Sequence, residues 1–254
     1  MKKTTWALCI ASALSTPAAF ATNLVGEAFV ATPQTIVSKV DGVMSSAPLE
    51  LGEPVLKQQL VASIETQDFE FALEKQQANV NLASADLVQK QSIYERYQEL
   101  SSKNSLAIND LDIAKAQYLT SKASLALAKI ELKEAKQALE DTQITTSISG
   151  FIVSSSVESG DWVSKGDALY QVINIDQISV RLYASEYDIN SLQIGQSVTL
   201  WAETAPSQLI KAQISRIGVQ LDPNTKAYPI EIDIENQGHQ LKPGMSIHAT
   251  TDSQ

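Results

Sequence analysis

The chain is poor in side chains that could do covalent or metal chemistry. Its two histidines, His239 and His248, stand nine residues apart, and its single cysteine, Cys9, lies near the N-terminus. A soft-metal site needs a cluster of thiolate, imidazole or thioether ligands. The serines around Glu158 lack the Gly-x-Ser-x-Gly spacing of a nucleophile elbow and have no histidine near them in sequence, although a catalytic triad is assembled in space. The residues therefore favour a binding or connecting protein over an enzyme, without metal or cofactor.

The charge of the chain excludes one large class of partner. Among 254 residues, 29 are acidic and 19 are basic, which gives a formal net charge of −10. Such a chain lacks the basic surface that displaces counterions from phosphates, so we expect no nucleic-acid partner. The same negative charge opposes binding to anionic lipid.

Residues 1–21 have the pattern of a secretory signal peptide. Lys2 and Lys3 precede an apolar run over residues 6–14, and small residues follow up to Ala19-Phe20-Ala21. This order predicts cleavage after Ala21 and export to the periplasm. The alternative, an N-terminal membrane anchor, would need a longer apolar run, and no later stretch reaches the roughly 18 apolar residues of a membrane span.

The chain contains an internal repeat. Residues 40–66 and 148–174 align without a gap at a constant offset of 108, and seven pairs coincide: Gly42 with Gly150, Gly52 with Gly160, Glu53 with Asp161, Val55 with Val163, Lys57 with Lys165, Val61 with Leu169 and Ile64 with Val172. Coincident turn glycines and apolar positions indicate two copies of one β unit with about four short strands each. Because a few short strands are only marginally stable alone, the two copies must meet in one sandwich.

The residues between the two copies predict a helical hairpin. Residues 67–143 contain no glycine or proline, and apolar residues recur every seven positions, with small residues three places later in the second half: Leu73, Val80, Leu87 and Tyr94, then Leu111, Tyr118, Leu125, Leu132 and Leu139 with Ala114, Ser121, Ala128 and Ala135. This is coiled-coil spacing. Residues 101–105 (SSKNS) interrupt it with turn-forming residues, so two antiparallel arms of about 50 Å are expected. The alternative is a helical bundle packed on the β domain, which would bury a wider apolar stripe.

The C-terminal part reads as a small antiparallel β-barrel. Five alternating segments, separated by loops with glycine and proline, are expected to be strands: 178–183, 197–201, 210–217, 229–234 and 245–250. One helical turn is expected within residues 187–192. The extended segment at residues 22–38 is expected to add a strand to this barrel.

The order of these elements resembles the periplasmic adaptor subunits, or membrane fusion proteins of the HlyD-like family, of tripartite efflux systems. The likeness rests on the split Gly-x-x-Val halves and on residues 236–245 (NQGHQLKPGM), which are similar to the family's barrel signature. It implies an elongated α+β fold, in which a long antiparallel α-helical coiled-coil hairpin interrupts a split lipoyl-like β-sandwich and a small antiparallel β-barrel follows. After the signal peptide (residues 1–21), the expected parts are 22–38 joining the barrel, 39–66 and 144–174 as lipoyl-like halves, 67–143 as the hairpin and 175–254 as the barrel.

The resemblance also implies contact residues at the hairpin tip. Arg96, Leu100 and Asp112 match the spacing of the family's motif for engaging the outer-membrane channel. Seven residues after Leu100 the motif usually has serine, whereas this chain has Ala107, so a hydroxyl donor for a TolC-type channel is lost. Arg96 has a second interpretation as a solvated intrahelical ion pair, because glutamates at positions 95 and 99 flank it.

The resemblance implies a non-catalytic adaptor that assembles, as a hexamer, between an inner-membrane transporter of the RND type and an outer-membrane TolC-type channel. Two alternatives stay open. The chain could serve an ABC-type exporter or secretion system, or it could be a binding module that never touches an outer-membrane channel. A lipoyl or biotinyl carrier is disfavoured, because the turn that bears the modified lysine is replaced by the helical insertion and Lys57 and Lys165 lie in other turns. Few residues follow Met245, as in a short form of the family.

Overall fold

A computed structural model of the chain describes residues 22–30, 32–103 and 107–251, and the signal-peptide prediction for residues 1–21 lies outside this part. The chain divides into two compact units. One comprises Thr32–Asn174, and the other combines Met1–Ala31 with Ile175–Gln254. Among the described residues, no helix is both long and apolar enough to cross a membrane.

Eight short strands of the first unit form a sandwich of two four-stranded sheets. Their orders are β2-β9-β7-β4 and β6-β5-β3-β8. The first copy of the repeat supplies β2 (Gln34–Val37), β3 (Gly42–Ser46), β4 (Pro54–Val55) and β5 (Leu60–Ile64), and the second supplies β6 (Gln143–Thr145), β7 (Gly150–Ser155), β8 (Trp162–Val163) and β9 (Ala168–Ile173). The offset of 108 carries each strand of one sheet onto its counterpart in the other. Each copy gives two strands to each sheet, which confirms that the copies fold as one β body.

Backbone hydrogen bonds repeat with the same pseudo-twofold symmetry. The amide of Ser38 donates to the carbonyl of Asp167 at 2.9 Å, and the amide of Thr146, at the equivalent position, donates to the carbonyl of Gln59 at 3.2 Å. Both residues are buried, and each hydroxyl donates to a carbonyl two residues on, at 2.6 Å from Ser38 and 2.8 Å from Thr146. The buried amides and hydroxyls of Ser38 and Thr146 therefore all have hydrogen-bond partners.

The N-terminal segment at residues 22–38, expected to join the barrel as a whole, is divided between the two units. β1 (Asn23–Phe29) joins the barrel sheet, whereas β2 pairs with β9 in the sandwich. The reason is that Ile36 belongs to the sandwich core and β2 is the first strand of the repeat, equivalent to β6. The repeated unit thus begins about six residues before residue 40.

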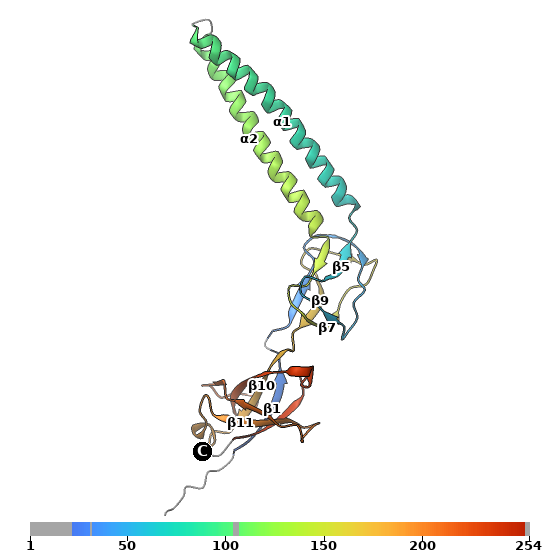
Figure 1. The fold of residues 1–254 in the computed structure, drawn as a ribbon, viewed down its shortest axis with the longest axis vertical. Coiled ribbons are helices and arrows are strands. Elements are labelled where there is room, and N and C mark those ends of the chain that lie inside the picture. Colours follow the sequence, from blue (N-terminus) through green and yellow to red (C-terminus); the bar gives the residue numbers. More distant parts are fainter. Residues whose placement is uncertain (1–21, 31, 104–106, 252–254) are drawn as a thin grey trace, which may run out of the picture. The chain divides into compact units, whose positions relative to one another are not determined.

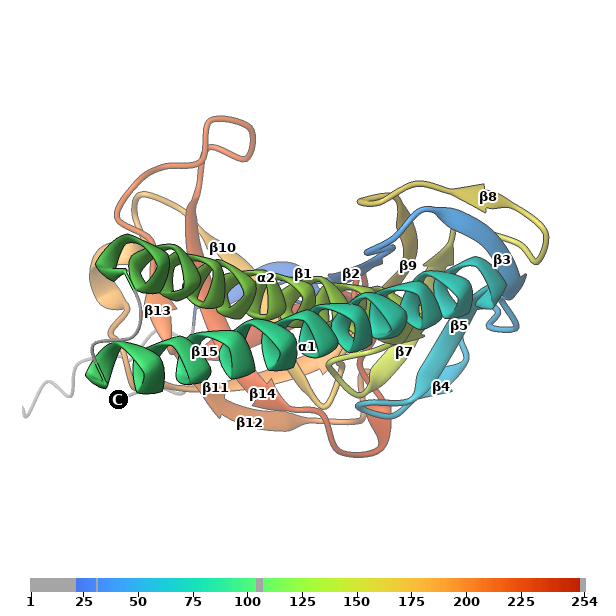
Figure 2. The same ribbon diagram turned by 90° about the horizontal axis from the view of Figure 1, so that it is seen from above.

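The helical insertion is a two-helix hairpin, as predicted. α1 (Gln67–Ser102) and α2 (Ile108–Glu140) run side by side in both views (Figures 1 and 2) and pack mainly on each other. The only buried residues of the two helices, within the described part, are three of the four small residues of the second heptad series: Ala114, Ser121 and Ala128. The rings of Tyr94 and Tyr118 stack across the pair with centroids 5.5 Å apart. The hairpin is therefore not a bundle packed on the strands.

The two ends of the hairpin are joined at the sandwich. The amide of Ile64 in β5 donates to the carbonyl of Thr142, two residues after α2, at 2.9 Å. Phe69, in the first turn of α1, packs against the sandwich core. The lysine amine of Lys39 contacts the Asp141 carboxylate at 3.1 Å, at the end of α2.

The second unit is a seven-stranded antiparallel sheet in the order β12-β11-β15-β1-β10-β14-β13. Its later strands are β10 (Gln177–Ala184), β11 (Ser197–Ala202), β12 (Ile210–Gln213), β13 (Arg216–Ile217), β14 (Tyr228–Glu235) and β15 (Ser246–Thr251), with single 3-10 turns at Ile189–Ser191 and Gln237–His239. The segment at 210–217, expected as one strand, is two. β12 pairs with one end of the sheet and β13 with the other, because the chain crosses between them at buried Ile214 and so closes the barrel.

Candidate functional site

The four residues predicted at the tip lie where α1 ends and α2 begins. Arg96 and Leu100 occupy the last turns of α1, Ala107 directly precedes α2, and Asp112 lies in the second turn of α2. All four side chains are exposed, Leu100 by 37%. Residues 104–106 between them are outside the described part. The stacked rings of Tyr94 and Tyr118 pack the two helices together next to these residues.

Arg96 does not form the intrahelical ion pair that its neighbours suggested. Glu95 accepts a hydrogen bond from the side-chain amide of Gln91 at 2.8 Å, and Glu99 contacts the amine of Lys103 at 2.6 Å. Within the described residues, no carboxylate or other acceptor contacts the Arg96 guanidinium. Its five N–H donors are therefore available to a partner's carboxylate or carbonyl groups.

Ala107 occupies the N-cap position of α2. Its backbone is extended, with φ −69° and ψ 138°, and its carbonyl accepts from the amides of Asp110 at 3.1 Å and Leu111 at 3.4 Å. No side chain in the described part of the chain caps this helix end. A serine here would accept a hydrogen bond from an otherwise unpaired amide of the first turn. With alanine at this position, the first turn of α2 lacks that stabilising hydrogen bond.

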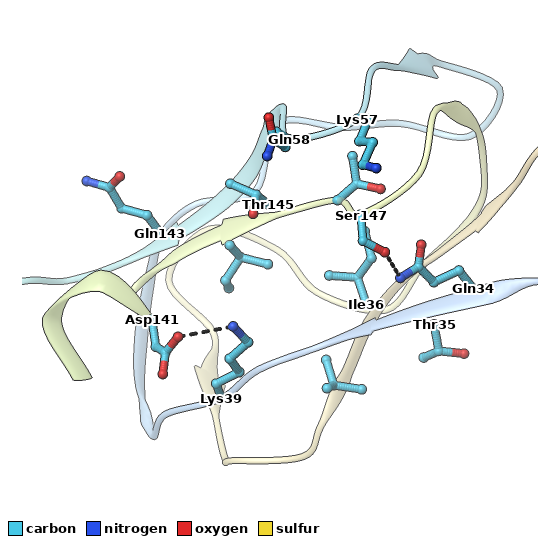
Figure 3. A pocket seen from close by; sticks show the side chains of 13 residues that line it. Gln34, Thr35, Ile36, Lys39, Lys57, Gln58, Asp141, Gln143, Thr145 and Ser147 are labelled. Atoms are coloured by element: carbon cyan, nitrogen blue, oxygen red, sulfur yellow. Dashed lines mark hydrogen bonds and ion pairs between the residues drawn. The ribbon is translucent and has the colours of Figure 1, made fainter. Parts of the chain in front are cut away.

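A polar cleft of about 430 Å³ opens between the edge strands β2 and β6 (Figure 3). Two contacts cross it: the Lys39–Asp141 ion pair and a hydrogen bond that the side-chain amide of Gln34 donates to the Ser147 hydroxyl. The ion pair joins the first copy of the repeat to the end of α2, and the hydrogen bond joins the first copy to the second. The described residues that line this cleft include no histidine or cysteine. The arrangement ties the base of the hairpin to the sandwich.

The outer face of the barrel carries an ion-pair network. Glu231 accepts from the guanidinium groups of Arg181 at 2.8 Å and Arg216 at 2.9 Å, and Arg216 also contacts Asp233 at 2.9 Å. Hydrogen bonds from the two arginines, Arg181 first, lower the pKa of Glu231. Arg181 also lies 4.3 Å from the centre of the Phe29 ring on β1. The network therefore connects β1, β10, β13 and β14.

The few side chains that could bind a metal or take part in catalysis do not lie together in the described structure. His239 contacts the Asp176 carboxylate at 2.8 Å in a loop of the barrel, whereas the His248 ring stacks on Trp201 at 5.9 Å. Among the described residues, no three or more histidine, cysteine, aspartate or glutamate side chains gather in a way that could hold a metal ion. Lys57 and Lys165 are exposed turn residues. The described structure thus offers contact surfaces as its candidate sites.

Two family models match the chain in adjacent stretches. A CzcB-like barrel-sandwich hybrid domain matches residues 32–174, and a CusB-like β-barrel domain matches residues 178–254. The first match alone covers more than half of the chain. The chain belongs to the membrane fusion protein family.

Known relatives agree with this membership. The multidrug resistance protein MdtA of Photorhabdus laumondii is 23% identical over 86% of this chain, which spans 56% of that relative's length. The membrane fusion protein Spr0693 of Streptococcus pneumoniae has a TM-score of 0.71 at 20% identity, over 92% of this chain and 99% of its own. MacA of Actinobacillus actinomycetemcomitans has a TM-score of 0.72 at 23% identity, over 92% and 78%. The two structures share the fold of this membrane fusion protein.

The barrel signature of this family member has a structural role that the sequence did not reveal. The buried Asn236 side chain donates to the carbonyls of Ile175 at 2.9 Å and Leu241 at 2.8 Å, and its oxygen accepts from the amide of Leu241 at 3.0 Å. Gly244, at φ +86°, donates its amide to the carbonyl of Ala28 at 2.8 Å. The signature therefore fixes a loop against the start of β10 and the end of β1.

Proposed function

We propose that this membrane fusion protein is a non-catalytic periplasmic adaptor that links an inner-membrane efflux transporter of the RND type to an outer-membrane channel of the TolC type. Family membership supports the adaptor role, and the signal-like residues 1–21 support export. The name of the relative MdtA supports drugs as cargo. The chain spans little more than half of that relative's length, and its own partners and cargo are therefore proposed here.

One observation carries the docking part of this proposal. Arg96 and Leu100 present a cation without an acceptor in the described residues and an exposed apolar side chain, one turn apart on α1. A helix tip with such a pair can place Leu100 in a shallow apolar site while the guanidinium binds carbonyl or carboxylate groups beside it. Asp112, on the neighbouring helix, adds an acceptor of opposite charge. This pattern suits the end-to-end contact of two helical hairpins.

Ala107 favours a second candidate function, an adaptor of an ABC-type exporter or secretion system that makes no contact with a TolC-type channel. The residue lacks the hydroxyl that the family's tip motif usually offers. Under this alternative the exposed tip has no channel partner, and substitutions there leave transport unchanged.

The test is a double substitution at the tip, made in cells whose own copy has been deleted: Arg96→Asp reverses a charge, and Leu100→Asp replaces an apolar side chain by a charged one. A panel of antibiotics, dyes, detergents and metal salts first identifies the compounds to which the deletion strain has become sensitive. We expect the double variant to reach the wild-type protein level and to leave the cells as sensitive as the deletion strain. Gln89→Asp with Ser92→Asp, on exposed positions of the same helix, is the matched control and should restore resistance. Full resistance with the tip variant would refute docking through these residues.

A further inference from the structure

A hollow of about 330 Å³ lies beside β8, the edge strand of the sandwich that pairs with β3 (Figure 2). Three of the residues that line it are buried and apolar: Val157, Val163 and Leu169. The others are exposed: Ser156, Asp161, Trp162, Asp167 and Ala168. The described lining thus includes two carboxylates and no lysine, arginine or histidine. Its volume lies within the range of small-molecule binding sites.

Trp162 exposes an indole that the fold of β8 does not require. Its side chain is 67% exposed, although tryptophan is one of the side chains that gain most from burial. The equivalent strand of the first copy, β4, has the same length with Pro54 at the corresponding position. A two-residue strand therefore forms at this place in the repeat without an aromatic side chain. The exposed ring is accessible to a ligand.

Asp167 carries a charge that its turn does not require. The Asp167 carboxylate accepts a hydrogen bond from the amide of Ser164 at 2.8 Å. In the first copy, Gln59 accepts the equivalent hydrogen bond from the amide of Leu56, also at 2.8 Å. A neutral side chain closes the same turn there, so the turn needs an acceptor and not a negative charge.

Asp161 brings a second carboxylate to the same hollow. Its Oδ2 accepts from the amide of Glu158 at 2.8 Å, as the Oδ2 of Asp167 accepts from Ser164. Within the described residues, the Oδ1 atom of each aspartate has no hydrogen-bond or ion-pair partner. Lys165, in the turn between the two aspartates, is exposed and does not belong to the lining. Each carboxylate can therefore still accept from a ligand.

Ala168 leaves space in which such a ligand can lie. The equivalent residue of the first copy is Leu60, whose larger side chain is 52% exposed. The second copy thus differs from the first by an indole, a charge and a smaller side chain, and all three changes line one hollow. The first copy forms the same strands and turns without them. The three differences are therefore not explained by the fold.

Together these features suit an organic cation. The face of an exposed indole attracts ammonium groups through its quadrupole, and quaternary ammonium ligands are recognised in this way. The two carboxylates add attraction for positive charge, and the buried apolar residues can contact hydrocarbon groups. A metal ion suits the hollow less well, because an indole offers it no ligand atom. In addition, no three histidine, cysteine, aspartate or glutamate side chains of the described chain gather to hold one.

We propose that this hollow binds an organic cation that carries an aromatic or alkyl group. The charged nitrogen lies against the face of Trp162, near Asp161 and Asp167, and the hydrocarbon part contacts Val163 and Leu169. This binding goes beyond the adaptor role proposed above and is independent of docking at the hairpin tip. Because most of the lining is exposed, and exposed charge pairs contribute little, we expect an affinity in the millimolar range.

Benzyltrimethylammonium is a suitable probe, and the chain contains its own reporters. Beyond residue 21 it has two tryptophans, Trp162 at the hollow and Trp201 in the barrel. The protein is labelled with nitrogen-15 and purified after export, and its two indole N–H signals are assigned with Trp162→Phe. We expect the Trp162 signal to shift to saturation as the probe is added, while the Trp201 signal stays in place. An unshifted Trp162 signal, or equal shifts of both signals, would overturn the proposal.

Two further probes test whether the charge matters. Benzyl alcohol keeps the aromatic ring without a charge, and phenylmethanesulfonate keeps the ring beside a negative charge. We expect each to bind about tenfold more weakly than the cation, because each lacks the attraction to the indole face and to the carboxylates. Equal dissociation constants for the three probes would indicate a hollow that takes any aromatic ring, and would overturn the assignment to a cation.

The first copy of the repeat supplies a variant that should keep the fold. Ala168→Leu introduces the residue that the first copy has at this place, and should weaken binding of the probe about tenfold by filling the hollow. Gln171→Leu, at an exposed position of the same strand outside the hollow, is the matched control and should bind the probe as the unchanged protein does. Unchanged binding by Ala168→Leu, or equal weakening by both variants, would overturn the location of the site.

The charge of Asp167 is tested in the same way. Asp167→Gln copies Gln59 of the first copy, so the hydrogen bond that closes the turn should persist. The dissociation constant of the probe should rise about two- to fivefold, the range expected for one exposed ion pair. An unchanged dissociation constant would contradict the part assigned to this carboxylate.

Discussion

At the scale of single residues, two arginines differ in whether a carboxylate of the described chain pairs with them. Arg96 at the tip has no acceptor within the described residues, whereas Arg216 on the barrel is held by Glu231 and Asp233. The surroundings explain the difference, since β14 presents two carboxylates beside Arg216, while Glu95 and Glu99 are engaged by Gln91 and Lys103. The first arginine is a candidate contact, and the second is part of the barrel.

Ala107 gives a prediction about the stability of the tip. Ala107→Ser should stabilise the first turn of α2 by about 1 kcal/mol, because the hydroxyl can accept from an unpaired amide at this N-cap. Amide hydrogen exchange in residues 109–112 should slow about fivefold. Ala116→Ser, at an exposed position inside α2, is the control and should not slow exchange, since serine is a poorer helix former than alanine. Unchanged exchange with Ala107→Ser would mean that Ala107 is not the functional cap.

Glu231 gives a prediction about acid. Because Arg181 and Arg216 lower its pKa in the folded barrel, the charged carboxylate contributes stability at neutral pH. That contribution is fully present above the unfolded pKa of about 4.3 and is lost as the pH falls through the lowered folded pKa. Glu231→Gln should therefore lower the urea midpoint of barrel unfolding at pH 7, and the difference from wild type should shrink below about pH 4. A difference of equal size at pH 7 and pH 3 would contradict the role assigned to these ion pairs.

At the scale of elements, the repeat in the sequence becomes a sandwich in which each four-stranded sheet takes strands from both copies. β3 of the first copy pairs with β8 of the second, and β4 of the first pairs with β7 of the second. The strands are two to six residues long, so each would be marginal without its partner from the other copy. The interleaving explains why the helices and turn of residues 67–141 can be inserted between the copies without separating them.

The equivalent glycines Gly42 and Gly150 give a prediction about this packing. A Cβ atom at Gly150 would lie 2.1 Å from the backbone oxygen of Ile173, whereas at Gly42 it would lie 2.6 Å from the side-chain Cγ2 of Ile64. A backbone strand cannot move aside as a side chain can. Gly42→Ala should cost about 1 to 3 kcal/mol of unfolding free energy, the usual cost of overpacking, and Gly150→Ala should cost more. Equal costs in urea unfolding would contradict the close approach of β7 and β9.

The sequence predicted the elements better than their pairing. Glycines and apolar residues at an offset of 108 predicted the two copies, and the seven-residue spacing of leucines predicted the hairpin. The sequence comparison did not identify β2 and β6 as part of the repeat, because their residues differ. Only Ile36 matches Ile144, and Ser38 resembles Thr146. The division of strands between the two sheets was not predictable, because it depends on backbone hydrogen bonds between residues more than a hundred positions apart.

For the candidate site, spacing placed Arg96, Leu100, Ala107 and Asp112 at one end of the hairpin, and the structure agrees that all four are exposed there. Their contact with a channel remains the proposal made above. Spacing alone did not predict that Arg96 would lack a partner, because that depends on which side chains occupy Glu95 and Glu99. It also missed Asn236, since a buried asparagine and a surface asparagine look alike in sequence.

At the scale of the whole molecule, a β body holds the two ends of a hairpin that we propose makes the contacts with partners. The amide of Ile64 and the carbonyl of Thr142 are hydrogen bonded, so the two ends of the insertion already touch. A chain in which a two-residue Asn-Gly turn replaces residues 67–141 should therefore keep the strand pairing of the sandwich. Circular dichroism and urea unfolding of the purified variant should show a cooperative β protein without the helical signal.

Resistance conferred by this shortened chain shows whether the hairpin makes the contacts that efflux requires. It is produced in the deletion strain at the wild-type level and compared with the full chain against every compound to which the deletion strain is sensitive. We expect a folded, exported protein that restores no resistance, because the hairpin that is proposed to reach the channel is gone. Wild-type resistance from the shortened chain would contradict it.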